Sequence, residues 1–391
     1  MRAATVAELA VAADVRMPVD DPADLYQPAY ASLTDFLSVF WLVQSVLVDP
    51  DAWERLAFES IIDGAQHGLI YRETFFTPTR HLINGQSLAD IVSALDRGLA
   101  EAERTTGTTA RLIFDIDREF GPAVGLDHVA QLVQLRRSNA KGVDRVIGVG
   151  MDSTELGIDP TTYVDAYRAA SATGLRLTAH QGENSPASAA TAAVDVLGCE
   201  RVDHGITIID DETLTARFAE PRLPLTVCPN ANARIVPDVF GDLAAHPSRR
   251  MRDAGLLVTL NTDDPATIAL DLTQEYLLSA AAFGLGMDDL VEIATNAVEA
   301  SWLDESDKPA MAARIREAAQ PHGQSTFRRD SAGLPDRSAP LRSNADQRIT
   351  PLQNDVARHR NGRDRTARRP VIGPFSDRWP LAKPSVSSVP I

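Results

Sequence analysis

The sequence predicts an α/β protein built as a parallel (β/α)8 barrel, and three observations lead to this fold class. Up to about residue 319, short apolar runs alternate with amphipathic helical stretches. The runs are apolar along most of their length, as expected for parallel strands that helices cover on one face. The chain has 391 residues, enough for one large barrel or two ordinary domains.

The predicted strands number seven, whereas a closed barrel needs eight. In chain order they are 68–76, 111–117, 145–152, 175–180, 201–205, 223–229 and 256–264. Helices are predicted between them, among others at 87–104, 127–140 and 160–174. The chain opens directly on a helical stretch, ATVAELAVAADV, so we expect the barrel to lack its first strand.

The pattern of alternating elements ends near Pro321. Residues 321–391 are rich in Pro, Ser and Arg and show no apolar periodicity, which predicts a disordered tail. This tail contains 13 Lys and Arg against 6 Asp and Glu, so it is basic. The predicted organisation is therefore a barrel domain at 1–320 and a basic tail at 321–391.

Composition excludes several classes of function. The net charge of −16 rests on a strongly acidic barrel, which argues against nucleic acid as its main partner. No apolar run reaches 18 residues and the N-terminus has no uninterrupted apolar core, so neither a membrane span nor a signal peptide is expected. The two cysteines, Cys199 and Cys228, fit a reduced compartment, and we predict a cytoplasmic protein.

Polar side chains follow four consecutive predicted strands. They are His180 with Glu183, His204, the turn Cys228–Asn230, and Asp263 with Asp264. A single histidine or an Asp-Asp pair at a strand end is usually structural. Four such ends meet at one mouth when the barrel closes, within reach of one ligand. Imidazole and carboxylate groups are zinc ligands, and zinc makes water a nucleophile near neutral pH. The set therefore indicates metal-assisted hydrolysis.

The segments TAHQGEN, RVDHGI, LTVCPNAN and VTLNTDDPA resemble, in order and spacing, the motifs of the adenosine and adenine deaminase family of metal-dependent amidohydrolases. The resemblance covers about residues 1–318. It implies a zinc-dependent barrel that replaces the 6-amino group of a small-molecule purine with oxygen and releases ammonia.

The resemblance also implies roles for individual residues. Its metal ligands would be His180 and Asp263. As catalytic residues, Glu183 would protonate purine N1 and His204 would orient and deprotonate the attacking water. At the substrate, Asp264 would share a proton with N7, and Gly182 would let the backbone turn close to the base.

The resemblance favours adenosine as substrate, with adenine as the alternative. Two departures weaken the choice of adenosine: GMDSTELG at 150–157 differs from the DLAGDE-type segment of adenosine deaminases, and Gln181 stands where alanine is usual. Three further polar residues near strand ends, His81, Asp115 and Asp117, are predicted to be structural.

The family's remaining zinc ligands form a His-x-His pair on the first strand, and no two of the eight histidines here are two apart. The chain thus resembles the family from just after that strand, as if cut at its N-terminus. We therefore expect these 391 residues alone to bind zinc poorly and to be inactive. A version extended upstream is expected to bind zinc and to deaminate its substrate. An inactive relative or binding protein, and an amidohydrolase for another amine-bearing ring, stay as alternatives.

Overall fold

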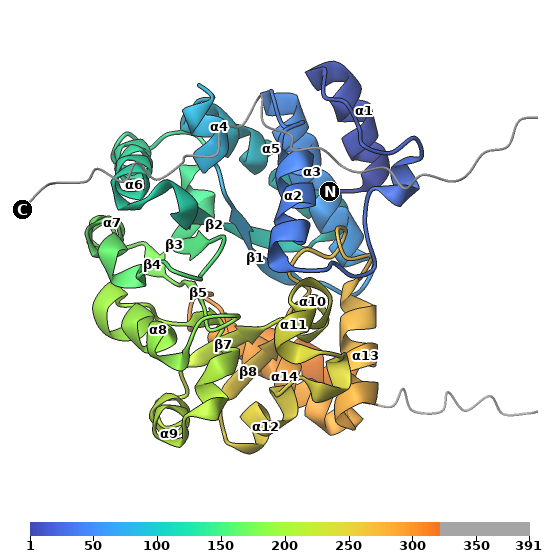
Figure 1. The fold of residues 1–391 in the computed structure, drawn as a ribbon, viewed down its shortest axis with the longest axis vertical. Helices are drawn as coiled ribbons and strands as arrows, with labels where there is room; N and C mark the ends of the chain where they lie inside the picture. The colour runs from blue at the N-terminus through green and yellow to red at the C-terminus, as the bar shows by residue number, and fades with distance from the viewer. Residues whose placement is uncertain (321–391) are drawn as a thin grey trace, which may run out of the picture. The chain divides into compact units, whose positions relative to one another are not determined.

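The computed structural model describes residues 1–320, in which a ring of parallel strands is surrounded by helices (Figure 1). Every strand pair in this part of the chain is parallel, as the alternation of strands and helices predicts. The strands are β1 (Tyr71–Phe76), β2 (Thr109–Asp117), β3 (Val146–Asp152), β4 (Arg176–Leu177), β5 (His180–Gln181), β6 (Val202–His204), β7 (Pro224–Val227) and β8 (Leu257–Leu260).

Helices precede, connect and follow these strands. The α-helices are α1 (Ala3–Ala13), α2 (Leu33–Gln44), α3 (Pro50–Ala65), α4 (Thr79–Ile83), α5 (Leu88–Thr106), α6 (Pro122–Arg137), α7 (Val164–Ser171), α8 (Ala187–Ala192), α9 (Glu212–Ala219), α10 (Pro229–Ile235), α11 (Pro237–Phe240), α12 (Ser248–Asp253), α13 (Leu272–Phe283), α14 (Met287–Ala300) and α15 (Lys308–Ala318). The helices predicted at 87–104 and 127–140 correspond to α5 and α6, and the third is divided into a 3-10 turn and α7.

The fourth predicted strand is divided into β4 and β5, which pair with different neighbours. β4 pairs with β3, and β5 pairs with β6. Between the two, the N–H of Thr178 donates to the carbonyl of Val149 at 3.0 Å, and the N–H of Asp203 donates to the carbonyl of Ala179 at 2.9 Å. These bonds carry the sheet across the break, so the four-stranded sheets β1–β4 and β5–β8 follow one another around the barrel.

The barrel has a seam between β1 and β8. Within residues 1–320, β1 pairs with β2 alone and β8 pairs with β7 alone. Side chains from both strands line a single cavity, among them Glu73 and Phe75 of β1 and Leu260 of β8. The described residues thus place no strand at the position where the sequence predicts that the first one is missing.

Two main hydrophobic cores support the two halves of the barrel. The larger one joins the outward faces of β2 and β3 to α3, α5, α6 and α7, with Phe114, Leu132 and Met151 fully buried. The smaller one, around Val202, Leu225 and Val258, joins β6 to β8 with the helices next to them. The division between the cores lies close to the break between β4 and β5.

Gly98 allows the closest helix contact of the larger core. A Cβ atom at this position of α5 would lie 2.1 Å from the carbonyl oxygen of Glu54 and 2.9 Å from the Cβ of Ala57, both on α3. We expect Gly98→Ala to lower the free energy of unfolding by about 1–3 kcal/mol, because the helices must move apart. Urea unfolding followed by circular dichroism measures this change.

The matched control for Gly98→Ala is Arg104→Ala, on the exposed part of the same helix. The side chain of Arg104 is 72% exposed and its ion pair with Glu101 lies at the surface. Its replacement is expected to change the free energy of unfolding by less than about 0.5 kcal/mol. Since alanine favours a helix over glycine by about 1 kcal/mol, a more stable Gly98→Ala protein would show that α3 and α5 adjust without cost.

Within residues 1–320 the α-carbon contacts form one compact unit, Met1–Gln320. The predicted disorder and basic character of residues 321–391 concern a segment that lies outside the described residues. None of the described helices is both long and apolar enough to cross a membrane.

Candidate active site

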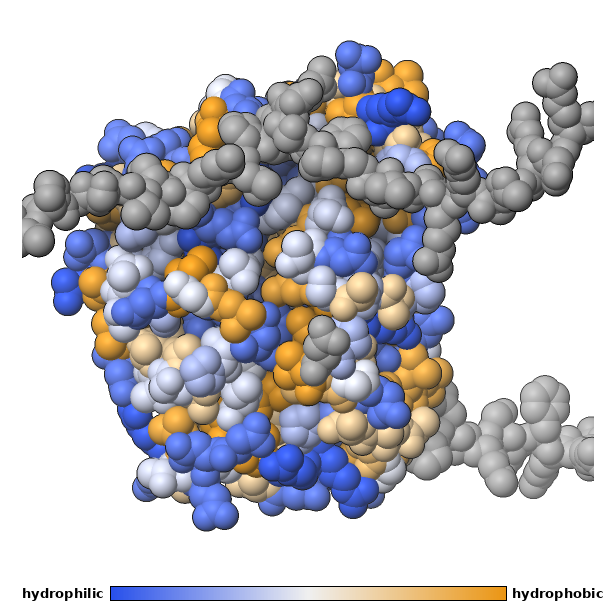
Figure 2. Space-filling model, viewed as in Figure 1, coloured by the Kyte–Doolittle hydropathy of each residue, from blue (hydrophilic) through white to orange (hydrophobic). Residues whose placement is uncertain are grey.

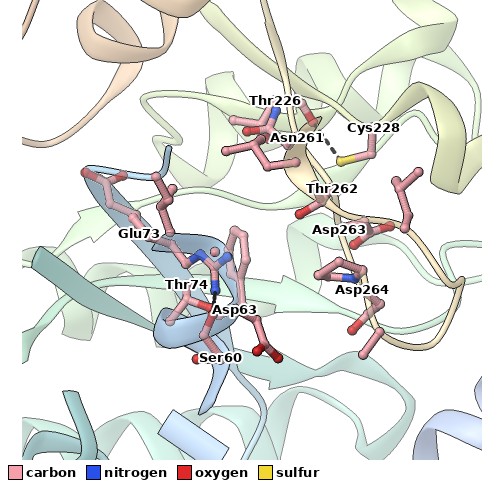
Figure 3. A pocket seen from close by; sticks show the side chains of 18 of the residues that line it. Ser60, Asp63, Glu73, Thr74, Thr226, Cys228, Asn261, Thr262, Asp263 and Asp264 are labelled. Carbon is pink, nitrogen blue, oxygen red and sulfur yellow. Dashed lines mark hydrogen bonds between the residues drawn. The ribbon is translucent and has the colours of Figure 1, made fainter. Parts of the chain in front are cut away.

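The predicted site residues lie together at the carboxyl ends of the strands. His180 is in β5, Gly182 and Glu183 follow it, and His204 ends β6. Asp263 and Asp264 form the turn after β8. All of these except Gly182 line one cavity of about 1110 Å³. Figure 3 shows Thr262, Asp263 and Asp264 on one side of this cavity and Glu73 and Thr74 of β1 on the other.

Asp203, which the sequence analysis did not identify as a site residue, lies next to His180. Its Oδ2 is 3.8 Å from the Nδ1 of His180. The hydroxyl groups of Thr178 and Thr226 donate to the two carboxylate oxygens at 2.6 and 2.5 Å. Burial opposes its charge, but the His180 ring, Arg201 and these hydroxyl groups lower the pKa of Asp203. The carboxylate faces the Nδ1 side of the ring without a hydrogen bond to it, so we assign Nε2 of His180 as the nitrogen for a metal.

Glu155 holds the loop that carries Gly182 and Glu183. Its carboxylate accepts the backbone N–H groups of Gly182 at 2.9 Å, Glu183 at 3.2 Å and Ser185 at 3.0 Å. Gly182 has φ +79°, and a Cβ there would meet the Thr207 hydroxyl at 2.9 Å, so the turn requires glycine. The backbone conformation at Glu183 is therefore fixed by its hydrogen bonds to Glu155.

Glu183 and His204 share one partner, the side-chain amide of Asn232 in α10. Its Nδ2 lies 2.9 Å from Oε1 of Glu183 and 3.1 Å from Nδ1 of His204. All three side chains are buried. Burial raises the pKa of Glu183, which favours the protonated acid. Burial disfavours a charged His204 ring, but Glu183 and Asp263 face it and raise its pKa.

Two site residues other than glycine have left-handed backbone conformations. His204 has φ 64° and Asp263 has φ 56°. Such conformations cost free energy in residues with a Cβ and cluster at functional sites. Both residues lie where the chain leaves a strand and changes direction. Their left-handed backbone conformation goes together with side chains that line the cavity.

The two aspartates after β8 are held in an environment that disfavours negative charge. Burial, and then the neighbouring carboxyl of Asp264, raise the pKa of Asp263 to about 8. Burial raises the pKa of Asp264 to about 6, although the α-amino group of Met1 opposes this. A cation in the cavity would favour the charged form of Asp263.

The opposite wall of the cavity carries two carboxyl groups from the first half of the barrel. Asp115 of β2 is buried, and its Oδ1 has no hydrogen-bond partner. Asp152 ends β3, and burial raises its pKa to about 8. Gly150 makes room for Asp115, whose Oδ1 would be 2.1 Å from a Cβ there. Asp115, predicted to be structural, thus faces the cavity.

Apolar side chains complete the wall. Phe75 packs edge-to-face on His180 with ring centroids 5.1 Å apart. Leu37, Phe40 and Trp41 of α2 also line the cavity. Figure 2 shows hydrophobic side chains gathered in the middle of the viewed face, where α2 and α10 lie in Figure 1. A flat apolar ring with polar edges suits such a cavity.

The predicted metal ligands fit zinc in kind but not in number. An imidazole nitrogen of His180 and a carboxylate of Asp263 are both zinc donors. Residues 1–320 contain no group of three or more His, Cys, Asp or Glu side chains placed to hold a metal ion. His180 and Asp263 are therefore two donors, whereas a catalytic zinc takes at least three from protein.

Two of the remaining polar residues have partners within the fold, and their structural role stays a prediction. Asp117 forms a buried ion pair with Arg80 at 3.1 Å. His81 is buried, with Gln44 3.0 Å from its Nε2. The residues that the sequence missed are Asp152, Glu155, Asp203, Asn232 and His246. The first four stand inside the segments GMDSTELG, RVDHGI and LTVCPNAN, so those motifs contained a signal for them, and His246 had none.

The comparisons with known proteins show which family the chain belongs to. Residues 1–318 match the adenosine deaminase family. An adenine deaminase of Streptomyces coelicolor is 36% identical over 304 residues, covering 77% of this chain and 86% of the relative.

Solved structures agree as well. The crystal structure of an adenine deaminase from Arthrobacter aurescens has a TM-score of 0.76 at 27% identity, covering 82% of this chain and 95% of that one. An amidohydrolase from Burkhoderia ambifaria, solved with bound Zn, has a TM-score of 0.72 at 31% identity, covering 82% and 87%. The predicted barrel fold and the predicted relationship are thereby confirmed, and a metal cofactor is indicated. The chain belongs to the adenosine and adenine deaminase family of amidohydrolases, whose members are hydrolytic deaminases.

Proposed function

We propose that this site hydrolyses adenine to hypoxanthine and ammonia with the help of a zinc ion. The observation that carries the proposal is the meeting of Glu183, His204 and Asp263 around one cavity, with His180 on its wall. Adenine replaces adenosine, the substrate that the sequence favoured, because the similar proteins are named adenine deaminases. The cytoplasmic location stays a prediction.

The residues divide the reaction between them. His180 and Asp263 would hold the zinc ion, which lowers the pKa of water toward neutrality when bound. His204 would orient the water toward C6 of the purine. Glu183, whose pKa is raised by burial, would give its proton to N1 as the oxygen bonds to C6. His204 would take one proton from the water and pass it to the amino group, and the new hydroxyl at C6 would return a proton to Glu183. Asp264 would share a proton with N7, and the C6–N bond would then break to release ammonia.

Asp152 supports a free base rather than a nucleoside. Asp152 at the end of β3 lines the same cavity as Glu183, and we place the N3 and N9 edge of a purine with N1 at Glu183 toward Asp152. The raised pKa, about 8, makes this carboxyl neutral near pH 7. A neutral carboxyl donates to N3 and accepts from N9–H at the same time. A nucleoside has no N9–H and carries a sugar at that position.

The function is tested by assaying adenine, 9-methyladenine and adenosine for ammonia release. Because two protein ligands are too few, the assay uses two forms of the protein. One is the 391-residue chain, and the other carries an added apolar strand with His-x-His before Met1, which the seam between β1 and β8 can receive. We expect adenine to be the preferred substrate, and the added strand to increase zinc content. Faster turnover of adenosine would overturn the choice of adenine, and no deamination in either form would favour a binding protein.

Asp152→Ala is expected to lower kcat/KM for adenine by roughly 10–100-fold, as the loss of one or two hydrogen bonds to a buried partner predicts. Asp152→Asn is the matched control, since an amide also donates to N3 and accepts from N9–H. The steady-state rates of the two variants measure the difference. Equal losses in both, or an unchanged Asp152→Ala enzyme, would remove Asp152 from base recognition.

A further inference from the structure

A line of three buried side chains runs behind the proposed acid. Asn232 in α10 contacts Glu183, His246 contacts Asn232, and Ser248 at the start of α12 contacts His246. The Nε2 of His246 lies 3.3 Å from Oδ1 of Asn232. Asn232 is 0% exposed and His246 is 3% exposed, so this line is buried in the protein.

The direction of every hydrogen bond in this line is set by a backbone group. The N–H of Ser248 points at Nδ1 of His246 at 3.3 Å and can only donate. Nδ1 of His246 is therefore an acceptor, and the Ser248 hydroxyl, 2.9 Å away, donates to it as well. Burial lowers the pKa of His246 to about 3, so the neutral ring carries its one proton on Nε2. That N–H donates to Oδ1 of Asn232.

Asn232 consequently presents its NH2 group, and not its oxygen, to the active site. The NH2 group donates to Oε1 of Glu183 at 2.9 Å and lies 3.1 Å from Nδ1 of His204. The reverse orientation would place an amide oxygen against Oε1 and would break the bond from His246. An oxygen that accepts this N–H is the poorer place for the Glu183 proton, which leaves Oε2.

We propose that Asn232, oriented by His246, is a positioning residue that selects Oε2 of Glu183 as the oxygen that delivers the proton to the ring nitrogen of the substrate. This inference rests on the proposed function. It adds that the backbone N–H of Ser248, at the start of α12, sets the position of the proton on Glu183 through His246 and Asn232. The backbone of Glu183 is held by Glu155, whereas its side chain is held by Asn232.

The kinetic test replaces the donor at each step of the line. Asn232→Asp exchanges the NH2 group for an oxygen at nearly constant shape, and we expect kcat to fall roughly 100-fold with KM changed less than about threefold. His246→Gln keeps an N–H near the position of Nε2 and is expected to stay within about threefold of the parent protein. His246→Met has a similar length but no donor, and kcat is expected to fall about tenfold.

The pH profile separates positioning from a merely structural role. The N–H of Asn232 favours the charged form of Glu183, so its loss raises the pKa of Glu183 further. Deamination needs the protonated acid. The pH at which activity falls on the alkaline side should therefore be higher in Asn232→Asp and His246→Met than in the parent protein, and unchanged in His246→Gln. Loss of activity with an unchanged profile in all three variants would overturn the inference.

A measurement without turnover keeps this inference apart from the proposed function. Carboxyl infrared bands assigned through Glu183→Gln titrate Glu183 in the protein without substrate. Nitrogen-15 shifts of His246 show which ring nitrogen is protonated. We expect the titration of Glu183 to move upward in Asn232→Asp, and the proton of His246 to lie on Nε2. A proton on Nδ1, or an unmoved titration, would refute the inference, whereas an adenine assay without product would refute only the proposed function.

Discussion

Glu183→Gln is expected to lower kcat for adenine by roughly 10²–10⁴-fold, the contribution of general acid catalysis. The amide oxygen of glutamine still accepts the N–H of Asn232, and the backbone still rests on Glu155, so the geometry is kept. Only the transferable proton is lost. The rate is measured in whichever form of the protein shows the higher zinc content.

Zinc content and hypoxanthine binding should stay close to the parent values in Glu183→Gln, because neither proposed metal ligand is changed. Glu200→Gln provides the control, since Glu200 pairs with Arg176 at the surface, outside the cavity. It should behave as the parent protein. Unchanged turnover in Glu183→Gln would remove Glu183 from the mechanism, and loss of zinc in it would make Glu183 a metal ligand instead.

Asp263→Ala and Asp264→Ala should have different effects although the residues are adjacent. Asp263→Ala is expected to weaken zinc binding by more than about tenfold and to abolish deamination, because one of the two visible ligands is lost. Asp264→Ala is expected to keep zinc and to weaken purine binding, since Asp264 would contact N7. Metal analysis after dialysis and calorimetric titration with hypoxanthine measure the two effects.

The left-handed backbone at Asp263 is the physical reason for this division. With φ 56° at Asp263, the chain turns between the two side chains, and both still line the cavity. Equal zinc content in the two variants would show that Asp263 is not a ligand. A loss of zinc in Asp264→Ala alone would exchange the two roles.

The strand order and the site were largely predictable because they depend on local signals. Apolar runs followed by His180, His204 or Asp263 mark the strand ends, and parallel strands bring those ends to one edge. The break between β4 and β5 was not predictable, since it depends on which neighbour each half of the strand pairs with. A short apolar run has the same sequence pattern whether it forms one strand or two strands with different neighbours.

The supporting residues were less predictable for a related reason. Asn232 and His246 are 14 residues apart and meet only because α10 and the segment before α12 fold over the same strand ends. Asp115 was predicted to be structural, as an aspartate within an apolar strand usually is. Its role in the wall of the cavity depends on Gly150 in the neighbouring strand, which no pattern within β2 reveals.

The break between β4 and β5 also separates two groups of site residues, one in each half of the barrel. The half with the larger core provides Asp115 and Asp152, the carboxyl groups on the wall opposite Asp263. The half that begins at β5 provides His180, Glu183, His204, Asp263 and Asp264. Under the proposed mechanism, the half that begins at β5 therefore holds the metal ligands and the groups at N1, C6 and N7, and the other half contacts the N3 and N9 edge of the purine. A small rotation of one half against the other would change which ring atom is presented to the water while leaving each group of residues intact. Specificity in this architecture can thus drift through the packing between half-barrels, without any substitution in the cavity itself.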